Sequence, residues 1–159
     1  MSLSLSPKII EDQILENFIE YQDLFIRYQS NFFTGLYKRY QGVENGSLVL
    51  YFAKQTHQEI LRKKDYDFNS DISFENFWNN HELIVPPKKS ITKIASSTSL
   101  PKETARRKIL QLVQQKVLSK KDKNTRWLPN EQYKESYNLI VKQEIIDLSS
   151  LLIYFCKKI

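Results

Sequence analysis

The stretch that decides the fold is Lys88–Leu128, which reads KKSITKIASSTSLPKETARRKILQLVQQKVLSKKDKNTRWL. Its apolar residues recur every three or four positions and predict a short helix over Ile91–Ser97, a tight turn at Thr98–Leu100, and a longer helix that opens at Pro101. Two short strand-like runs flank the polar turn Lys121–Asn124, a pattern typical of a β-hairpin. The stretch therefore predicts the order helix, turn, helix, hairpin.

The same stretch carries the positive charge of the chain. Between Pro86 and Arg126 there are twelve Lys and Arg residues and two acidic residues, Glu103 and Asp122, a net charge of +10. The whole chain of 159 residues has a formal charge of +6, so the remainder sums to −4. A basic module on an acidic remainder indicates a polyanionic partner.

Within this stretch, the residues that match a known pattern are Ile94-Ala95, Ser99-Leu100, Pro101, Thr104-Ala105, Ile109, Leu112 and Val117-Leu118. In their types and spacing they resemble the winged helix-turn-helix DNA-binding region of bacterial transcriptional regulators of the MarR and GntR kind, over about residues 88–128. The sequence departs from that pattern at Thr98, where leucine is usual, and at Ser99 and Lys116, where glycine is usual. A serine in the left-handed conformation costs about 1 kcal/mol relative to glycine, which the turn can tolerate.

Helical geometry sorts the second helix, which we expect to be the recognition helix over Lys102–Gln114. At about 100° per residue, one face turns inward and the opposite face outward. The inward residues are Ala105, Ile109, Leu112 and Val113, and the outward residues are Thr104, Arg107, Gln111 and Gln114.

Base and phosphate contacts follow from side-chain chemistry. Arg107 is the first choice for a base contact and Gln111 the second, because Arg pairs bidentately with guanine and Gln with adenine. We expect phosphate contacts from Lys93, Lys102, Arg106 and Lys108, and phosphate or minor-groove contacts from the wing residues Lys120, Lys121, Lys123 and Arg126. Trp127 is expected to anchor the wing to the core.

The flanking regions read as helical. Ser6-Pro7 predicts a helix start, after which an apolar stripe from Ile14 to Phe32 predicts one continuous helix that ends in a break at Gly42–Gly46. Three further helices are expected: Ser47–Lys64, one or two turns in the run SFENFW, and a long C-terminal helix over Glu131–Cys156. Pro86-Pro87 ends the region before the basic stretch, because neither proline nor the residue before it suits a helix. The expected fold is mainly α, with an N-terminal helical region (1–85), a winged helix-turn-helix (86–129) and a C-terminal helix (130–159). The flanking regions would complete the core and provide dimerisation surfaces.

Other features narrow the function class. The single cysteine, Cys156, excludes a disulfide within the chain and favours a reducing compartment. We see no secretory signal and no membrane-spanning run, and expect a cytoplasmic, nucleoid-associated protein without membrane contact. His57 and His81 have no metal-ligand spacing, and no catalytic motif occurs, so we expect neither metal nor cofactor nor enzyme activity.

The resemblance implies a sequence-specific, double-stranded DNA-binding transcriptional regulator. The wide aromatic stripes at Ile14–Phe33 and Tyr133–Phe155 predict that it acts as a homodimer. Two alternatives stay open: a replication or DNA-maintenance protein of phage or plasmid type, and a basic winged-helix module that binds RNA or an acidic protein. The sequence leaves open the operator, the direction of regulation and any small-molecule effector.

Overall fold

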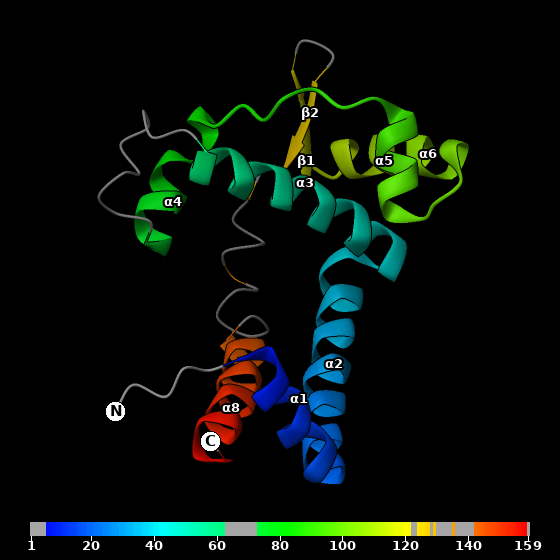
Figure 1. Cartoon of the computed structure of the whole chain (residues 1–159). Coiled ribbons are helices and arrows are strands. Elements are labelled where there is room, and N and C mark those ends of the chain that lie inside the picture. Colours follow the sequence, from blue (N-terminus) through cyan, green and yellow to red (C-terminus); the bar gives the residue numbers. More distant parts are fainter. Residues whose placement is uncertain are drawn as a thin grey trace. The chain divides into compact units, whose positions relative to one another are not determined.

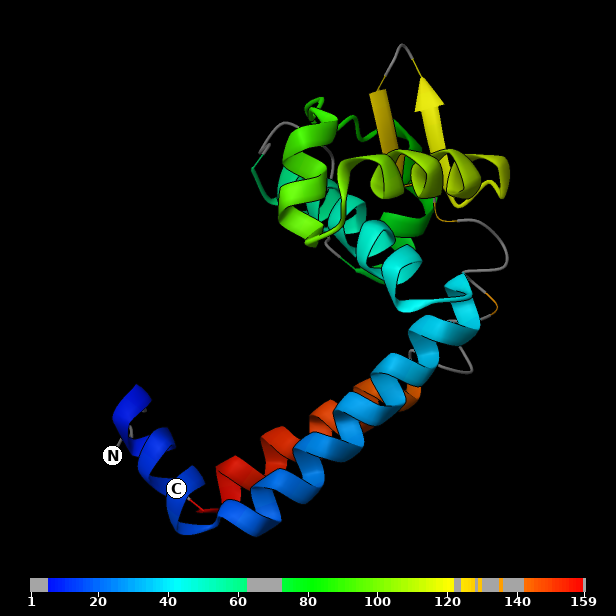
Figure 2. The same ribbon diagram turned by 90° about the vertical axis from the view of Figure 1, so that its right-hand side faces the viewer.

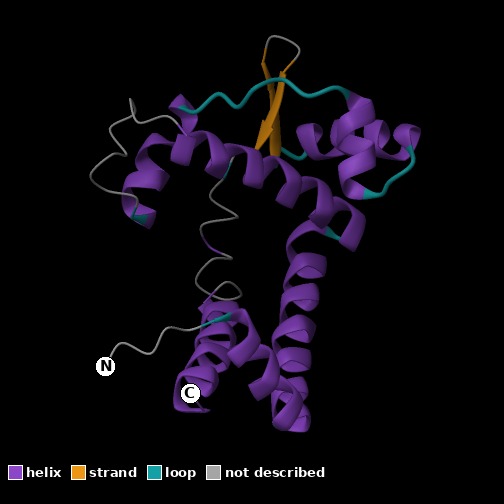
Figure 3. Ribbon diagram, in the orientation of Figure 1, coloured by secondary structure: helices purple, strands orange, loops and turns teal. Residues whose placement is uncertain are grey.

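The computed structural model describes residues 6–62, 73–121, 124–127, 129, 135 and 142–158. In these residues the chain is mainly helical, with one two-stranded antiparallel sheet (Figures 1 and 3), which confirms the expected mainly α class. The elements in chain order are α1 (Pro7–Glu16), α2 (Phe18–Tyr40), α3 (Val43–Arg62), α4 (Phe74–Asn80), the 3₁₀ turn η2 (His81–Leu83), α5 (Ile91–Thr98), α6 (Lys102–Gln114), β1 (Leu118–Lys121), β2 (Asn124–Trp127) and α8 (Lys142–Lys158).

The chain divides into two compact units, one formed by residues 1–36 with 135–159 and the other by residues 37–134. We call them the helical unit and the basic unit. The helices α3 and α4, which fall in the N-terminal region of the sequence division, belong to the same compact unit as α5, α6 and the hairpin.

In the helical unit, α2 and α8 lie side by side (Figure 2). Asn31 donates a hydrogen bond to the buried carboxylate of Asp147 over 2.6 Å, and the Tyr154 hydroxyl donates to Glu20 over 3.1 Å. As residue numbers fall along α2 they rise along α8, so the two helices run antiparallel. Their contact joins segments more than 100 residues apart in sequence.

The apolar stripe predicts a single N-terminal helix, and this prediction is wrong because the helix breaks at Asn17. The Asn17 backbone leaves helical geometry, with φ −115° and ψ 36°, and its side-chain amide donates to the Gln13 carbonyl oxygen over 3.0 Å. Asparagine commonly competes with the helix for backbone hydrogen bonds in this way. The predicted start is confirmed, since Ser6 caps α1 by accepting from the Ile9 amide.

The next break is narrower than the expected Gly42–Gly46. Helix α2 ends at Tyr40, Gln41 and Gly42 take positive φ values of 58° and 152°, and α3 already begins at Val43. The Asn45 side chain secures this corner by donating to the Tyr40 carbonyl oxygen over 2.8 Å. Helix α3 confirms the helix expected over Ser47–Lys64, with an earlier start.

Helix α3 is the centre of the basic unit. Its Leu48, Val49 and Phe52 are at most 4% exposed, and α5, α6 and β2 all pack against it. Burial of such side chains contributes about 1.5–3 kcal/mol each. The helix that precedes the basic stretch therefore forms part of the core on which that stretch folds.

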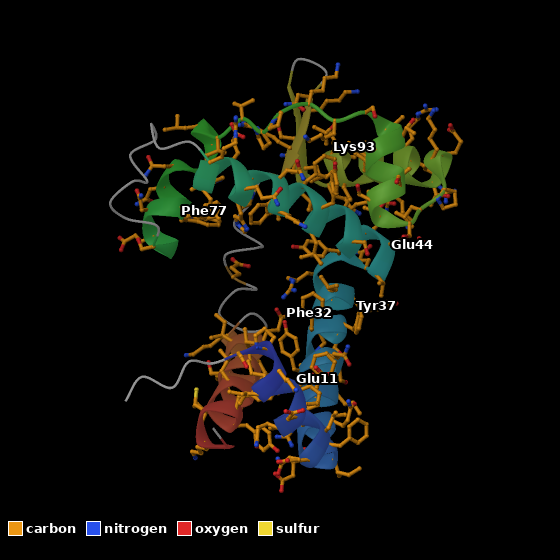
Figure 4. All side chains as sticks on the ribbon, viewed as in Figure 1. Glu11, Phe32, Tyr37, Glu44, Phe77 and Lys93 are labelled. Atoms are coloured by element: carbon orange, nitrogen blue, oxygen red, sulfur yellow. The ribbon has the colours of Figure 1, made fainter. Side chains whose placement is uncertain are left out.

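The hairpin is held at the end of this core by Trp127. Trp127 is 5% exposed, its ring stacks on that of Phe77 with centroids 5.8 Å apart, and it meets the His57 ring edge-on at 5.7 Å. Phe77 lies on α4 (Figure 4), in the short helix expected in SFENFW. The predicted anchoring role of Trp127 is confirmed.

Of the C-terminal helix expected over Glu131–Cys156, the structure describes α8 from Lys142. Most of residues 130–141 lie outside the described residues.

Candidate nucleic-acid interface

The turn between α5 and α6 sets the relative placement of these two helices. Ser90 caps α5 by accepting from the Lys93 amide, and Ser99 ends the helix in the left-handed conformation with φ 55°. The Leu100 amide then donates to the Ala95 carbonyl oxygen over 3.1 Å, which closes the turn. The serine thus takes the backbone conformation that favours glycine.

Small residues allow α5 and α6 to pack closely. Ala95 on α5 and Ala105 on α6 are both buried, as is Ile94, and the two helices are in contact. Lys116, the other position where glycine is usual, also takes a positive φ, 59°. Both unusual residues therefore adopt left-handed geometry at the ends of their helices.

Helix α6 spans Lys102–Gln114, the bounds expected from the sequence. Ala105, Ile109 and Leu112 are buried as predicted, whereas Val113 is half-buried. On the opposite side Arg107, Gln111 and Gln114 are exposed, and we call these three residues the outer face of α6. Thr104, also expected to point outward, is half-buried.

The basic residues of this region differ in what they contact. Lys102, Arg107 and Lys93, which lies on α5 (Figure 4), are exposed and form no hydrogen bond or ion pair with another described residue through their side chains. Arg106 pairs with Glu103 on its own helix over 2.7 Å, with both side chains exposed. An exposed pair of this kind is worth about 0–1 kcal/mol and separates readily.

Two of the expected contact residues are instead engaged inside the basic unit. The Lys108 ammonium lies 2.9 Å from the Glu44 carboxylate and 3.3 Å from the Asn45 side-chain oxygen, and its side chain is only 19% exposed. Glu44 stands at the start of α3 (Figure 4), so this ion pair ties α6 to α3. Lys108 thus serves as a link within the fold.

Arg126 also forms hydrogen bonds within the basic unit. Its guanidinium donates to the Glu82 carbonyl oxygen over 2.7 Å and to that of Ile84 over 3.4 Å, while Asn124 donates to the Pro86 carbonyl oxygen over 3.0 Å. Through these bonds β2 holds the extended segment that leads from η2 to α5. The loop that runs past the two strands in Figure 3 is this segment.

In the hairpin, Leu118 pairs with Trp127 and Lys120 with Thr125. Leu118 is buried and Lys120 is exposed, so the hairpin presents one basic side chain to solvent at this position. The side chains of Lys121 and Lys123, which belong to the expected wing contacts, lie outside the described residues.

Sequence reasoning missed the position of Lys89. It lies just before α5, is half-buried, and lines a hollow of about 170 Å³ together with Arg106 and Lys120. Nothing in the local pattern around Lys89 distinguishes it from its neighbour Lys88. Its place beside Arg106 and Lys120 depends on contacts between distant segments, which the sequence pattern does not reveal.

A larger hollow of about 480 Å³ lies between α3 and the end of α5, and includes Tyr51, Lys54 and Ser99 in its lining. The Tyr51 hydroxyl is buried and has no hydrogen-bond partner in the described part of the chain, and burial raises its pKa. Elsewhere in the unit, desolvation beside the rings of Phe77 and Trp127 lowers the pKa of His57, which stays partly exposed. In the helical unit, desolvation raises the pKa of Tyr154, and the Glu20 carboxylate, to which its hydroxyl donates, adds to the rise.

Among the residues that the structure describes, His, Cys, Asp and Glu side chains form no group of three that could hold a metal ion. None of the described helices has the length and apolar character required to cross a membrane. Comparison of the chain with protein-family models, curated proteins and solved structures found no match.

Proposed function

We propose that the chain is a sequence-specific, double-stranded DNA-binding transcriptional regulator whose basic unit is a winged helix-turn-helix. The outer face of α6 carries this proposal: Arg107, Gln111 and Gln114 are exposed on a helix whose opposite face is buried, within a stretch of net charge +10. Arginine and glutamine are the side chains that read guanine and adenine in the major groove. With α6 in that groove, its outer face would contact bases and the basic hairpin beside it would contact phosphates.

The internal contacts refine the set of proposed DNA contacts. We keep Arg107 and Gln111 for bases, Gln114 as a neighbouring polar contact, and Lys93, Lys102, Arg106 and Lys120 for phosphates. We leave out Lys108 and Arg126. Lys108 forms an ion pair with Glu44, and Arg126 donates hydrogen bonds to the carbonyl oxygens of Glu82 and Ile84.

The test compares Arg107→Ala with Lys102→Ala. Sequences selected from a random DNA pool by the wild-type protein would be compared with random duplex by fluorescence anisotropy at several salt concentrations. Arg107→Ala should lose about 1–3 kcal/mol of discrimination at one base pair. Lys102→Ala should weaken all sequences alike and reduce the salt slope by about one. Equal losses on selected and random DNA for Arg107→Ala would contradict the base contact.

We also propose that the helical unit pairs two copies of the chain. Ile19, Ile26 and Phe33 follow one another at intervals of seven on α2 and are 47–77% exposed. Helix α8 exposes a second apolar set, Ile145, Ile146, Leu148, Leu152 and Ile153, each at least 41% exposed. Groups of exposed large apolar side chains such as these two are typical of a surface that associates with another protein. A two-fold dimer would present two α6 helices to half-sites about 34 Å apart.

Sedimentation at micromolar concentration tests the dimer, and a monomer there, with and without DNA, would end the proposal. The informative variant is Leu152→Lys, which places a charge on the exposed apolar set of α8 and should shift the protein towards monomer. Leu61→Lys is the matched control, since Leu61 is a 72% exposed helical leucine in the basic unit. If both variants dissociate equally, the interface lies elsewhere.

A further inference from the structure

The hollow of about 170 Å³ in the basic unit brings together three cations from three separate elements. Lys89 comes from the segment before α5, Arg106 from α6 and Lys120 from β1. We call this site the basic hollow. None of the described residues that line it is acidic, and Glu103 pairs with Arg106 on the surface of α6.

Apart from Thr125, the other residues that line the basic hollow are apolar, and we call this non-cationic part of the lining its floor. It includes Ile91 at the start of α5, Leu110 and Val113 of α6, and Thr125, which stands opposite Lys120 in the hairpin. Leu110, in the middle of α6, is 49% exposed, whereas its neighbours Ile109 and Leu112 are buried in the core. The site thus combines three cations with an apolar surface that water solvates poorly.

This combination matches the chemistry of one nucleotide of a DNA backbone. A phosphate carries a full negative charge and accepts hydrogen bonds from Lys and Arg, whereas the adjoining deoxyribose presents mainly C–H groups. Ile91, the first residue of α5, lines the hollow, so the N-terminal end of that helix, where its dipole is positive, lies beside it. The Glu103 partner of Arg106 is 76% exposed, so Arg106 can exchange it for a phosphate at little cost.

We propose that the basic hollow seats one phosphate and its deoxyribose, with Lys89 as a backbone contact beside Arg106 and Lys120. This inference rests on the proposed DNA-binding function and assigns a residue to it that the sequence pattern does not mark. The contact fixes the position of the protein on the duplex and carries no base preference.

The experiment measures DNA affinity of the full chain against salt for Lys89→Ala and for Lys54→Ala. Lys54 is an exposed lysine on α3 that lines the other hollow, so both variants remove one positive charge from the basic unit. Each phosphate contact contributes about 0.9 to the slope of log affinity against log salt. The affinity advantage of wild type over Lys89→Ala should therefore shrink roughly 3.5-fold between 50 and 200 mM salt. Lys54→Ala should keep the wild-type slope.

A second measurement locates the contact on the DNA. Single phosphates of the selected duplex would be replaced in turn by neutral methylphosphonates. One replacement should weaken wild-type binding several-fold and have no effect on Lys89→Ala, while Lys54→Ala should respond as wild type does. Leu110→Glu, which brings a carboxylate into the exposed floor, should weaken binding more than Leu110→Ala.

The outcomes separate the inference from the function beneath it. Salt-dependent DNA binding by wild type with an unchanged slope for Lys89→Ala would overturn the basic hollow and leave the proposed function standing. Equal slope losses for Lys89→Ala and Lys54→Ala would also overturn it, because any surface charge would then serve. Absence of DNA binding by the wild-type chain would overturn both, and binding of RNA or an acidic protein would then have to explain the three cations.

Discussion

Replacing Ser99 by glycine should stabilise the basic unit, although the change removes a side chain. Ser99 lies at the end of α5 with φ 55°, in the region where a Cβ atom crowds the backbone. Its side chain is exposed, and its hydroxyl forms no hydrogen bond with another described residue. Glycine therefore relieves the crowding and loses no contact seen in the fold.

The magnitude follows from two opposing terms. A non-glycine residue in left-handed geometry costs about 1–2 kcal/mol. Glycine loses more conformational freedom on folding, which costs roughly 0.5–1 kcal/mol. The difference is about 0–1.5 kcal/mol, with a central value of about 0.75 kcal/mol of added stability, or roughly 3–6 °C in Tm for a unit of this size.

Tryptophan fluorescence during urea or thermal unfolding is the suitable assay. Both tryptophans of the chain, Trp78 and Trp127, belong to the basic unit, so the signal reports that unit. The control is the same substitution three residues earlier. Ser96 is exposed within helical α5, where glycine is worse than serine by about 0.5 kcal/mol.

Ser99→Gly and Ser96→Gly should thus shift the midpoint in opposite directions. A loss of stability for Ser99→Gly, or shifts of the same sign for both, would refute the assignment of strain to this turn. The circular dichroism of the native state should be unchanged in Ser99→Gly, because the glycine adopts the backbone already present.

Two further predictions concern titration and the helical unit. Desolvation lowers the folded-state pKa of His57 below its ordinary value of 6.5. The unfolding free energy should therefore be unaffected above pH 6.5 and fall as the pH drops through 6.5 towards the folded pKa. His57→Gln should flatten that part of the curve in urea titrations at a series of pH values, and an unchanged curve would argue against it. Asn31→Ala should destabilise the helical unit by about 1–3 kcal/mol, because the buried Asp147 carboxylate loses a donor at 2.6 Å. Circular dichroism in urea measures this change, with the exposed Gln29→Ala as control, and equal midpoints for the two variants would contradict it.

The sequence alone determined the helices and the hairpin of the basic stretch. Helix α6 has the predicted bounds and α5 ends one residue later than predicted, because their signals are local: Ser90 at a cap, Pro101 before a helix, and apolar residues at helical spacing. The inward placement of Ala105, Ile109 and Leu112 follows from the same spacing. The break at Asn17 was missed because asparagine occurs both inside helices and at their ends, and the apolar stripe continues across it.

The roles of the basic side chains were decided only by the tertiary structure. By sequence, Lys108 is as good a phosphate contact as Arg106, and Arg126 is as good a wing contact as Lys120. In the structure, Glu44 pairs with Lys108, and the carbonyl oxygens of Glu82 and Ile84 accept from Arg126. These partners lie more than 40 residues away along the chain. Helical and strand periodicity fix which way a side chain points on its own element, whereas its partner depends on how distant segments pack. For the same reason the basic hollow, built from three elements, exists only in the folded unit.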